Sequence, residues 1–257
     1  MPTLITRGAA SAKAYGFGAA IKAVPPAVYA FTGNTAAAYG GGATISVTIP
    51  TGGIPAGSAI YVFVLEGGVT VNGSVADNAS TPNTYSLLTS QNIIYSSGTQ
   101  QIYQSYNSNA LVAGNTITYT RSTPNSPVVM SVMYVTGLMI SGNPYDSVTL
   151  NYVAFNGGAQ PGANLSGTPS VSGEVFLAVL FWWDTVTHTV TLDTANGWIS
   201  PPPTTVPSFY SGGGYYIGFE GGYQINAGTG KLTTQPTISS VTANTLGGTF
   251  IFGLKHK

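Results

Sequence analysis

Two nearly continuous apolar runs decide the fold of this chain: residues 58–65 read SAIYVFVL, and residues 174–181 read EVFLAVLF. Both are rich in Val, Ile, Phe and Tyr, and both have the length of a strand. The longest fully apolar run, Val175–Trp183, has nine residues, well short of the roughly 20 that a membrane-spanning helix needs. Such runs are typical of strands that are buried on both faces or lie in the core of a sandwich.

The segments around these runs have the pattern of half-buried strands. Thr44–Pro50 and Val148–Phe155 alternate between apolar and polar residues with a period of two. Clusters of Gly, Pro, Asn and Ser separate the candidate strands, and no segment of helical length has an apolar face with a period of 3.6. We therefore predict an all-β fold, a jelly-roll-like antiparallel β-sandwich, over residues 43–257.

A weak internal repeat divides this body into two related halves, at about 43–140 and 146–257. Three pairs of landmarks recur at similar offsets: Tyr61–Leu65 with Val175–Val179 at 114 residues, Tyr85 with Trp198 at 113, and Gly137-Leu138 with Gly253-Leu254 at 116. Matches this close together favour duplication of one unit. The halves form either two sandwiches or two parts of one, and we favour a single domain because no polar linker separates them.

Charged residues are scarce: seven bases and seven acids make up 5% of the 257 residues, against about 25% in an average domain. This scarcity excludes nucleic-acid binding through phosphate contacts. The absence of cysteine excludes disulfides, thiolate metal sites and a cysteine nucleophile. The net charge is +3 over residues 1–65, −6 over residues 66–220 and +3 over residues 221–257. Either the basic front segment binds an acidic partner, or three charges are too few to carry meaning.

Residues 1–34 differ from the rest and are predicted to form an N-terminal anchoring arm. Small residues dominate the segment, and Pro25-Pro26 opposes helix continuation, so it has too little apolar bulk for a core of its own. Free termini usually fray unless another part of the structure binds them. We therefore expect a partner or the body of the protein to hold the arm. Arg7, Lys13 and Lys22 interrupt any apolar signal region, so we expect synthesis in the cytoplasm without an export signal, and no membrane insertion.

The opening MPTLITRGAASAKAYGFG, residues 1–18, resembles the start of many tailed-bacteriophage virion proteins. Tail fibres, minor tail proteins and other structural proteins of such phages often begin with I-[ST]-R-G-A-A-S-A-[RK]-x-[FY]-G-F. Twelve positions match: Ile5, Thr6, Arg7, Gly8, Ala9, Ala10, Ser11, Ala12, Lys13, Tyr15, Gly16 and Phe17. The resemblance covers only the arm, but it is fairly specific.

A second and looser resemblance covers roughly residues 57–255. The order of short motifs is similar to that of a β-sandwich module found in phage appendages and in secreted bacterial proteins. The matching residues include Asp77, Asn83, Thr84, Tyr85, Gly173, Glu174, Gly197, Trp198 and Lys255. This resemblance implies a fold and no activity.

Together the resemblances imply a phage virion structural protein that is docked by its arm to capsid, portal, neck or tail proteins. The sandwich would be displayed outside, as a tail fibre or another host-facing appendage. A capsid decoration or head-fibre protein is the alternative. A carbohydrate-binding module or adhesin is the second alternative. A secreted module of this kind would be expected to have a signal peptide, and we do not expect one in this sequence. We expect a homo-oligomer, and a host-surface glycan is a further candidate ligand.

Within the arm, each virion-anchoring residue has an expected role. Arg7 suits a carboxylate or carbonyl partner. Gly8, Gly16 and Gly18 allow close approach of another backbone. Ile5, Tyr15 and Phe17 are expected to fill apolar pockets on the particle.

The inventory of titratable residues argues against an enzyme. His256 is the penultimate residue, and His188 lies in an alternating stretch where we expect it to face solvent. Glu174 is expected at a strand rim, and its spacing from Glu220 gives no sign of a glycosidase pair. No nucleophile elbow, phosphate-binding loop or zinc motif occurs. We therefore predict no catalytic residue, cofactor or metal.

Two groups of residues suggest binding. Asp77, Asn78 and Asn83 in one loop, with Asp193 and Asn196 in the equivalent loop, offer oxygen ligands for Ca²⁺, but such residues more often form turns, and we favour turns. Trp182 and Trp183 are adjacent, so we expect one in the core and the other exposed. An exposed tryptophan would serve a subunit interface or, less often, a glycan.

The tyrosine-rich stretch that contains Tyr215 and Tyr216 is either a binding loop or a strand with alternating aromatics, and we favour the strand. Trp198 is expected to be a core residue that corresponds to Tyr85 in the first half.

Overall fold

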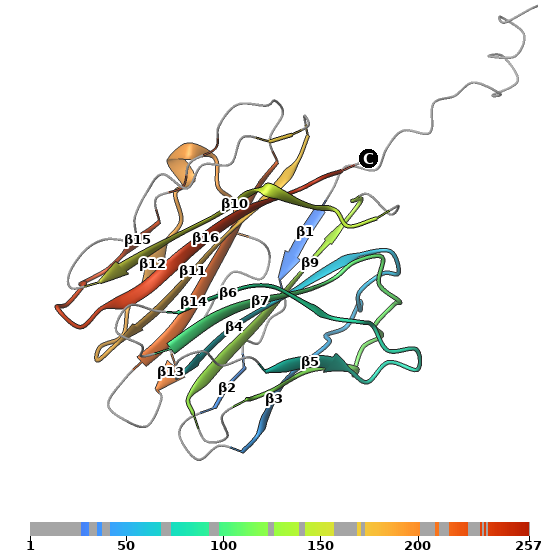
Figure 1. The fold of residues 1–257 in the computed structure, drawn as a ribbon, viewed down its shortest axis with the longest axis horizontal. Coiled ribbons are helices and arrows are strands. Elements are labelled where there is room, and N and C mark those ends of the chain that lie inside the picture. The colour runs from blue at the N-terminus through green and yellow to red at the C-terminus, as the bar shows by residue number, and fades with distance from the viewer. Residues whose placement is uncertain are drawn as a thin grey trace, which may run out of the picture.

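The computed structural model describes residues 27–30, 35–37, 42–67, 73–92, 98–122, 126–138, 142–156, 169–170, 173–200, 209–210, 216–225, 232, 234 and 236–256 (Figure 1). The strands are β1 (Ala27–Ala30), β2 (Thr35–Ala37), β3 (Thr44–Thr48), β4 (Ala59–Gly67), β5 (Ser74–Asp77), β6 (Ser86–Asn92), β7 (Gly98–Ser105), β8 (Thr116–Thr120), β9 (Val128–Thr136), β10 (Tyr145–Asn156), β11 (Val175–Asp184), β12 (Val190–Thr191), β13 (Phe209–Tyr210), β14 (Tyr216–Ile225), β15 (Thr237–Ile238) and β16 (Leu246–Leu254). The described part of the chain has one short 3-10 helix, η2 (Thr194–Asn196), and no helix that could cross a membrane. The predicted all-β fold is confirmed.

Two large antiparallel sheets repeat the same order of strands. The N-half sheet runs β1-β9-β4-β7-β6, with β2 also paired to β9, and the C-half sheet runs β10-β16-β11-β14-β13. In the N-half sheet the apolar strand β4 lies between β9 and β7. In the C-half sheet the apolar strand β11 lies between β16 and β14. Both β9 and β16 are the last strand of their half. A smaller sheet accompanies each large one: β3-β8-β5 in the first half and β12-β15 in the second.

The connectivity of the first half is that of a jelly roll. We count β1 and β2 together as the first strand, so that β3 to β9 are the second to the eighth. The large sheet then joins the first, eighth, third and sixth strands (β1/β2, β9, β4 and β7). The small sheet joins the second, seventh and fourth strands (β3, β8 and β5). The fifth strand, β6, extends the edge of the large sheet beside β7. The second half keeps this plan with a reduced small sheet. The sandwich begins earlier than the predicted residue 43, because β1, inside the predicted arm of residues 1–34, and β2 both pair with β9. The boundaries of the two halves stay predictions.

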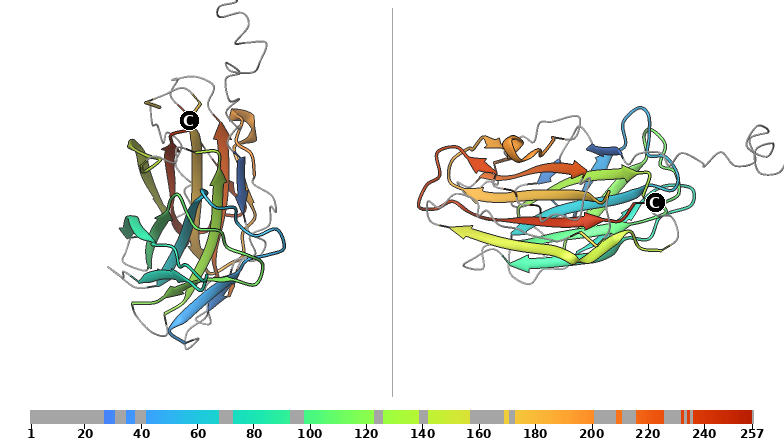
Figure 2. Two further views of the ribbon diagram at one scale, coloured as in Figure 1. Left: turned by 90° about the vertical axis from the view of Figure 1, so that its right-hand side faces the viewer. Right: turned by 90° about the horizontal axis from the view of Figure 1, so that it is seen from above.

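The two large sheets pack face to face and share one core, so the halves form one packed unit. Tyr61, Phe63 and Leu65 of β4 meet the C-half sheet, where Leu177 and Phe181 of β11 belong to the same buried cluster. Figure 2 shows the blue-to-green sheets and the yellow-to-red sheet stacked against each other. This packing gives each large sheet one face buried by the other.

The outer faces of the large sheets are buried as well. Ile60, Val62 and Val64 of β4 pack against the small sheet that carries Ile117 and Tyr119. On the other side of the molecule, alternate residues of β11 are covered by segments around Trp198 and Ile238. Burial on both faces explains why β4 and β11 are apolar throughout rather than alternating.

Glycines in the C-half sheet make room for aromatic rings on neighbouring strands. Gly218 lies opposite Trp182 in the pairing of β14 with β11, and a Cβ at this glycine would overlap the indole ring. Gly247 and Gly248 of β16 are covered in the same way by Phe155 and Tyr152 of β10. A ring over a glycine restores the packing that the missing side chain would otherwise supply.

This arrangement predicts that Gly218→Ala destabilises the protein by about 1–3 kcal/mol, because the added methyl group displaces a buried tryptophan. Gly222→Ala is the matched control on the same face of β14. Its Cβ would meet mainly the side chain of Leu192, at 3.1–3.3 Å, and a small shift of that side chain relieves the contact. Denaturant unfolding of the two variants checks the prediction, and equal losses would contradict it.

Candidate functional site

The adjacent tryptophans are both buried, so the prediction of one exposed aromatic platform is wrong. Trp183 lies in the core between the large sheets. Trp182 lies on the opposite face of β11, in a cluster with Ile238 that Tyr216 partly covers. The segments around β12 and β15 cover this second face, and period-two reasoning gives no sign of such a cover. Tyr215 and the arm residues Ile5, Arg7, Gly8, Tyr15, Gly16 and Phe17 lie outside the described residues.

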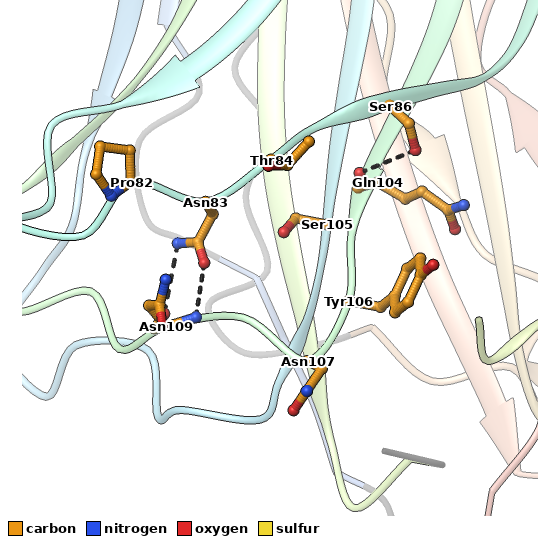
Figure 3. A pocket seen from close by; sticks show the side chains of 9 residues that line it. All are labelled: Pro82, Asn83, Thr84, Ser86, Gln104, Ser105, Tyr106, Asn107 and Asn109. Carbon is orange, nitrogen blue, oxygen red and sulfur yellow. Dashed lines mark hydrogen bonds between the residues drawn. The ribbon is translucent and has the colours of Figure 1, made fainter. Parts of the chain in front are cut away.

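An uncharged groove of about 400 Å³ lies at the end of the N-half sheet (Figure 3). Its walls come from the segment that enters β6 and from the end of β7 and the turn after it. The lining residues are Pro82, Asn83, Thr84, Ser86, Gln104, Ser105, Tyr106, Asn107 and Asn109. Amide and hydroxyl groups dominate this surface, and the only titratable side chain in it is a tyrosine.

Two asparagines hold the walls of the groove together. Asn109 donates its backbone N–H to Oδ1 of Asn83 at 2.6 Å, and Asn83 donates back to the Asn109 carbonyl at 3.4 Å (Figure 3). Asn107 turns the chain with a positive φ of 52°, a conformation that asparagine tolerates well. The groove is therefore fixed by its own hydrogen bonds.

Tyr106 and Gln104 supply the contact groups of the groove. The Tyr106 side chain is 41% exposed, which is high for a large aromatic residue. The side-chain oxygen of Gln104 is buried and accepts no hydrogen bond. The sequence analysis missed this groove because its two walls are about 20 residues apart. The signal was the asparagine-rich stretch that contains Asn107 and Asn109.

The loop that holds Asp77 and Asn83 is tied by internal hydrogen bonds. Asp77 accepts from the Asn83 side-chain amide at 2.9 Å, from the Tyr85 hydroxyl at 3.0 Å and from the Ala79 backbone at 3.1 Å. Burial, with the Asp77 charge beside it, raises the pKa of Tyr85. These contacts favour the turn interpretation over Ca²⁺, and they anchor one wall of the groove.

The equivalent loop of the second half repeats the motif: Asn196 donates to the carboxylate of Asp193 at 2.7 Å. Trp198, two residues later, is 2% exposed, as expected of a core residue. In the described residues no group of three or more His, Cys, Asp or Glu side chains has the arrangement of a metal site.

His188 does not face solvent as the alternation predicts, because its side chain is fully buried. Its Nε2 lies 2.6 Å from Asp184 Oδ2, its Nδ1 lies 2.6 Å from the Ser239 carbonyl oxygen, and its ring packs edge-on against Trp182. Both ring nitrogens therefore have a hydrogen-bond partner. This contact closes the end of β11 against the loop before β16.

Asp184 is the centre of this contact. Burial alone would raise its pKa, but hydrogen bonds from Thr245, Thr185, His188 and Thr242 together hold the pKa below its usual value. Its side chain is fully buried. The arrangement is a buried hydrogen-bond network that joins β11 to the segment before β16.

The two glutamates considered for glycoside hydrolysis are far apart. Glu174 is 0% exposed, so its predicted position at a rim is wrong. Glu220 pairs with Leu180 on β11, six residues beyond Glu174, which places the carboxyls about 20 Å apart along the strand. Retaining and inverting glycosidases need separations of about 5–9.5 Å. His256 is half-buried and bridges to Leu138 at the end of β9.

The described surface carries no exposed charged side chain. Every acid of the sequence falls within the described residues, and each is buried or half-buried, as are the two described bases. These nine residues are Glu66, Asp77, Arg121, Asp146, Glu174, Asp184, Asp193, Glu220 and Lys255. The net −6 of the middle segment therefore does not translate into an acidic outer surface.

Comparisons of the chain with protein-family models, with curated proteins and with solved structures found no match.

Glu220 gives the stability of the protein a predicted pH dependence. Burial raises its pKa to about 7, against a weak opposing hydrogen bond from Ser200. The folded state therefore holds this proton more tightly than the unfolded chain, and stability falls as pH rises from about 4.5 through 7. Glu220→Gln removes that loss.

The melting temperature of Glu220→Gln should exceed that of the parent protein by more at pH 8 than at pH 5. Thermal melts of both proteins across this range provide the measurement. A difference that does not change with pH would show that Glu220 titrates normally.

Proposed function

We propose that the protein is a non-enzymatic structural component of a phage particle. In this proposal it is made in the host cytoplasm and attached to other virion proteins through the part of the predicted arm that precedes β1. The sandwich is displayed outside, as a tail fibre or another host-facing appendage. The resemblance of residues 1–18 to phage virion proteins suggests the particle, and the low charge of the described surface supports a role in assembly.

The low charge of the described surface is the observation that carries this proposal. Burying a charge at an interface costs several kcal/mol unless the charge is paired. A surface that exposes little charge over the described residues lowers this cost where it meets a neighbour. The same property promotes association when the protein is free, because little charge repels like molecules. Both effects favour a protein that works within an oligomer or a larger particle.

The placement of the carboxylates supports a non-enzymatic role. The carboxylates of Asp77 and Asp184 form hydrogen bonds with neighbouring residues of the fold. The residues that line the groove include no carboxylate and no histidine. General acid–base catalysis needs such a group within reach of a substrate. The groove is suited to binding rather than to bond cleavage.

The anchoring role predicts that deletion of residues 1–24 removes the protein from purified particles. The sandwich should still fold, because its first described strand, β1, begins at Ala27 and is retained. Immunoblots of particles assembled with the truncated protein measure incorporation, and thermal melts check folding. Arg7→Ala should also reduce incorporation, with Lys22→Ala as the matched single-charge control. Normal incorporation of the truncated protein would refute the proposal.

The number of copies per particle separates the tail-appendage assignment from capsid decoration. A tail component is present in a few to tens of copies, whereas a decoration protein is present in hundreds. Gel densitometry of purified particles against the major capsid protein gives this number. A count in the hundreds would move the protein to the capsid.

Glycan binding is a second candidate function, favoured by the groove. Neutral sugars are bound by amide and hydroxyl groups with an aromatic ring beside them, and the groove offers these groups and an exposed Tyr106. The absence of charged lining residues favours a neutral saccharide over a sialylated or phosphorylated one.

Tyr106→Ala should weaken binding of a neutral glycan about tenfold or more, since an aromatic stacking contact of about 1.4 kcal/mol is lost. Val112→Ala, which removes an exposed apolar side chain outside the groove lining, is the matched control. A glycan array identifies the ligand, and calorimetry on both variants measures affinity. Equal affinities would exclude the groove as the site.

A further inference from the structure

Three side chains of complementary chemistry meet at one end of the C-half sheet. Asp146 on β10 pairs with Gly253 on β16, and the next positions on β16 bring Lys255 to the same end. Leu254 pairs with Val175 on β11, so Glu174 lies beside Lys255 across the strands. The amine and the two carboxyl groups therefore come from three adjacent antiparallel segments, with the lysine on the middle one.

The two carboxyl groups of this triad are buried and share hydrogen bonds. Asp146 is 2% exposed and Glu174 is 0% exposed. The backbone N–H of Ser170 donates to both carboxyls, at 3.2 Å to Asp146 and 3.0 Å to Glu174, and the Ser170 hydroxyl donates to Glu174 at 3.0 Å. Because both carboxyls accept from the same Ser170 N–H, they lie close together. Two like charges this close in a buried site favour the state in which one carboxyl keeps its proton.

Lys255 is within reach of this pair. Its Nζ lies 3.7 Å from Oδ1 of Asp146, and its side chain is 32% exposed. Gly253 leaves room for this arrangement because it has no side chain. A Cβ at this position would overlap both Glu174 Oε2 and the ring of Phe176. The triad is packed against β16 with an apolar ring at its side.

A simple ion pair does not explain this construction. Lys255 needs one carboxylate as a partner, and a second buried carboxyl adds a further desolvation cost. A lysine amine, a carboxylic acid and a second carboxyl are, however, the two reactants and the proton carrier of an amide condensation.

We propose that Lys255 and Asp146 condense into an intramolecular isopeptide bond, with Glu174 as the proton carrier. Glu174 gives its proton to Asp146 and takes one from the Lys255 ammonium, which leaves a free amine beside a carboxylic acid. Nζ attacks Cγ of Asp146, and the new C–N bond forms. A second amine proton passes through Glu174 to the departing hydroxyl, the C–O bond breaks, and water leaves. The ammonium and the carboxylate are thereby replaced by an amide and one water.

This bond would close a loop over nearly the whole second half of the chain. It would tie the C-terminal strand β16 to β10, where the sheet would otherwise begin to separate. The sequence contains no cysteine, so disulfides are not available for this purpose. The cross-link is independent of the proposed virion function and of the glycan groove.

Intact-mass spectrometry of the purified full-length protein tests the proposal. The parent protein should be lighter than its sequence mass by one water, about 18 Da, and a protease digest should contain a branched peptide joining the segments around Asp146 and Lys255. Lys255→Arg keeps the charge but has no attacking amine, and Glu174→Gln removes the proton carrier. Both variants should have their full sequence masses.

Asp146→Asn provides a further check on the chemistry, since an asparagine would release ammonia, about 17 Da, in place of water. If Glu174→Gln fails to fold, the parent protein and Lys255→Arg still decide the matter. The cross-linked parent should melt on the order of 10 °C above Lys255→Arg. A parent protein at its full sequence mass, without a branched peptide, would overturn the proposal.

Discussion

The structure depends on the back-to-back burial of β4 and β11. Each strand has one face in the core between the large sheets and the other against a covering layer of its own half. A fully buried large apolar side chain contributes about 1.5–3 kcal/mol, so these two strands supply a large share of the driving force for folding. Neighbouring strands add to the contact between the halves, since Met133 of β9 lies against Gly221 of β14.

Burial in several layers constrains the polar groups. A buried charge that lacks a partner is strongly destabilising, so each must be matched within the sheets. Glu66, at the end of β4, accepts hydrogen bonds from Tyr119 and from Ser126, and Arg121 lies nearby. Asp184, at the end of β11, is matched by His188 and threonines. The two central strands thus end in equivalent ways, each on an acidic residue bound by the surrounding loops.

The sequence was sufficient to predict the strands, because period and apolar run length report burial directly. The repeat at an offset of about 114 residues corresponds to the shared strand order of the two large sheets. The sequence pattern could not predict burial by segments from elsewhere in the chain. The segment that covers Trp182 and the loop that buries Glu174 are examples. The groove likewise needs two segments that meet only after folding, so the tyrosine and asparagines that line it looked like ordinary loop residues.

The scarcity of charge has a more specific physical meaning in the folded protein. The acidic residues between positions 66 and 220 are buried or half-buried in the folded protein, where several of them bind loops. They therefore contribute little charge to the described outer surface. A neutral surface cannot rely on long-range electrostatic steering, and its contacts must come from shape, hydrogen bonds and apolar area. Such contacts are weak singly and gain strength when many copies are held together. These are the contacts on which the proposed role in an ordered assembly would depend.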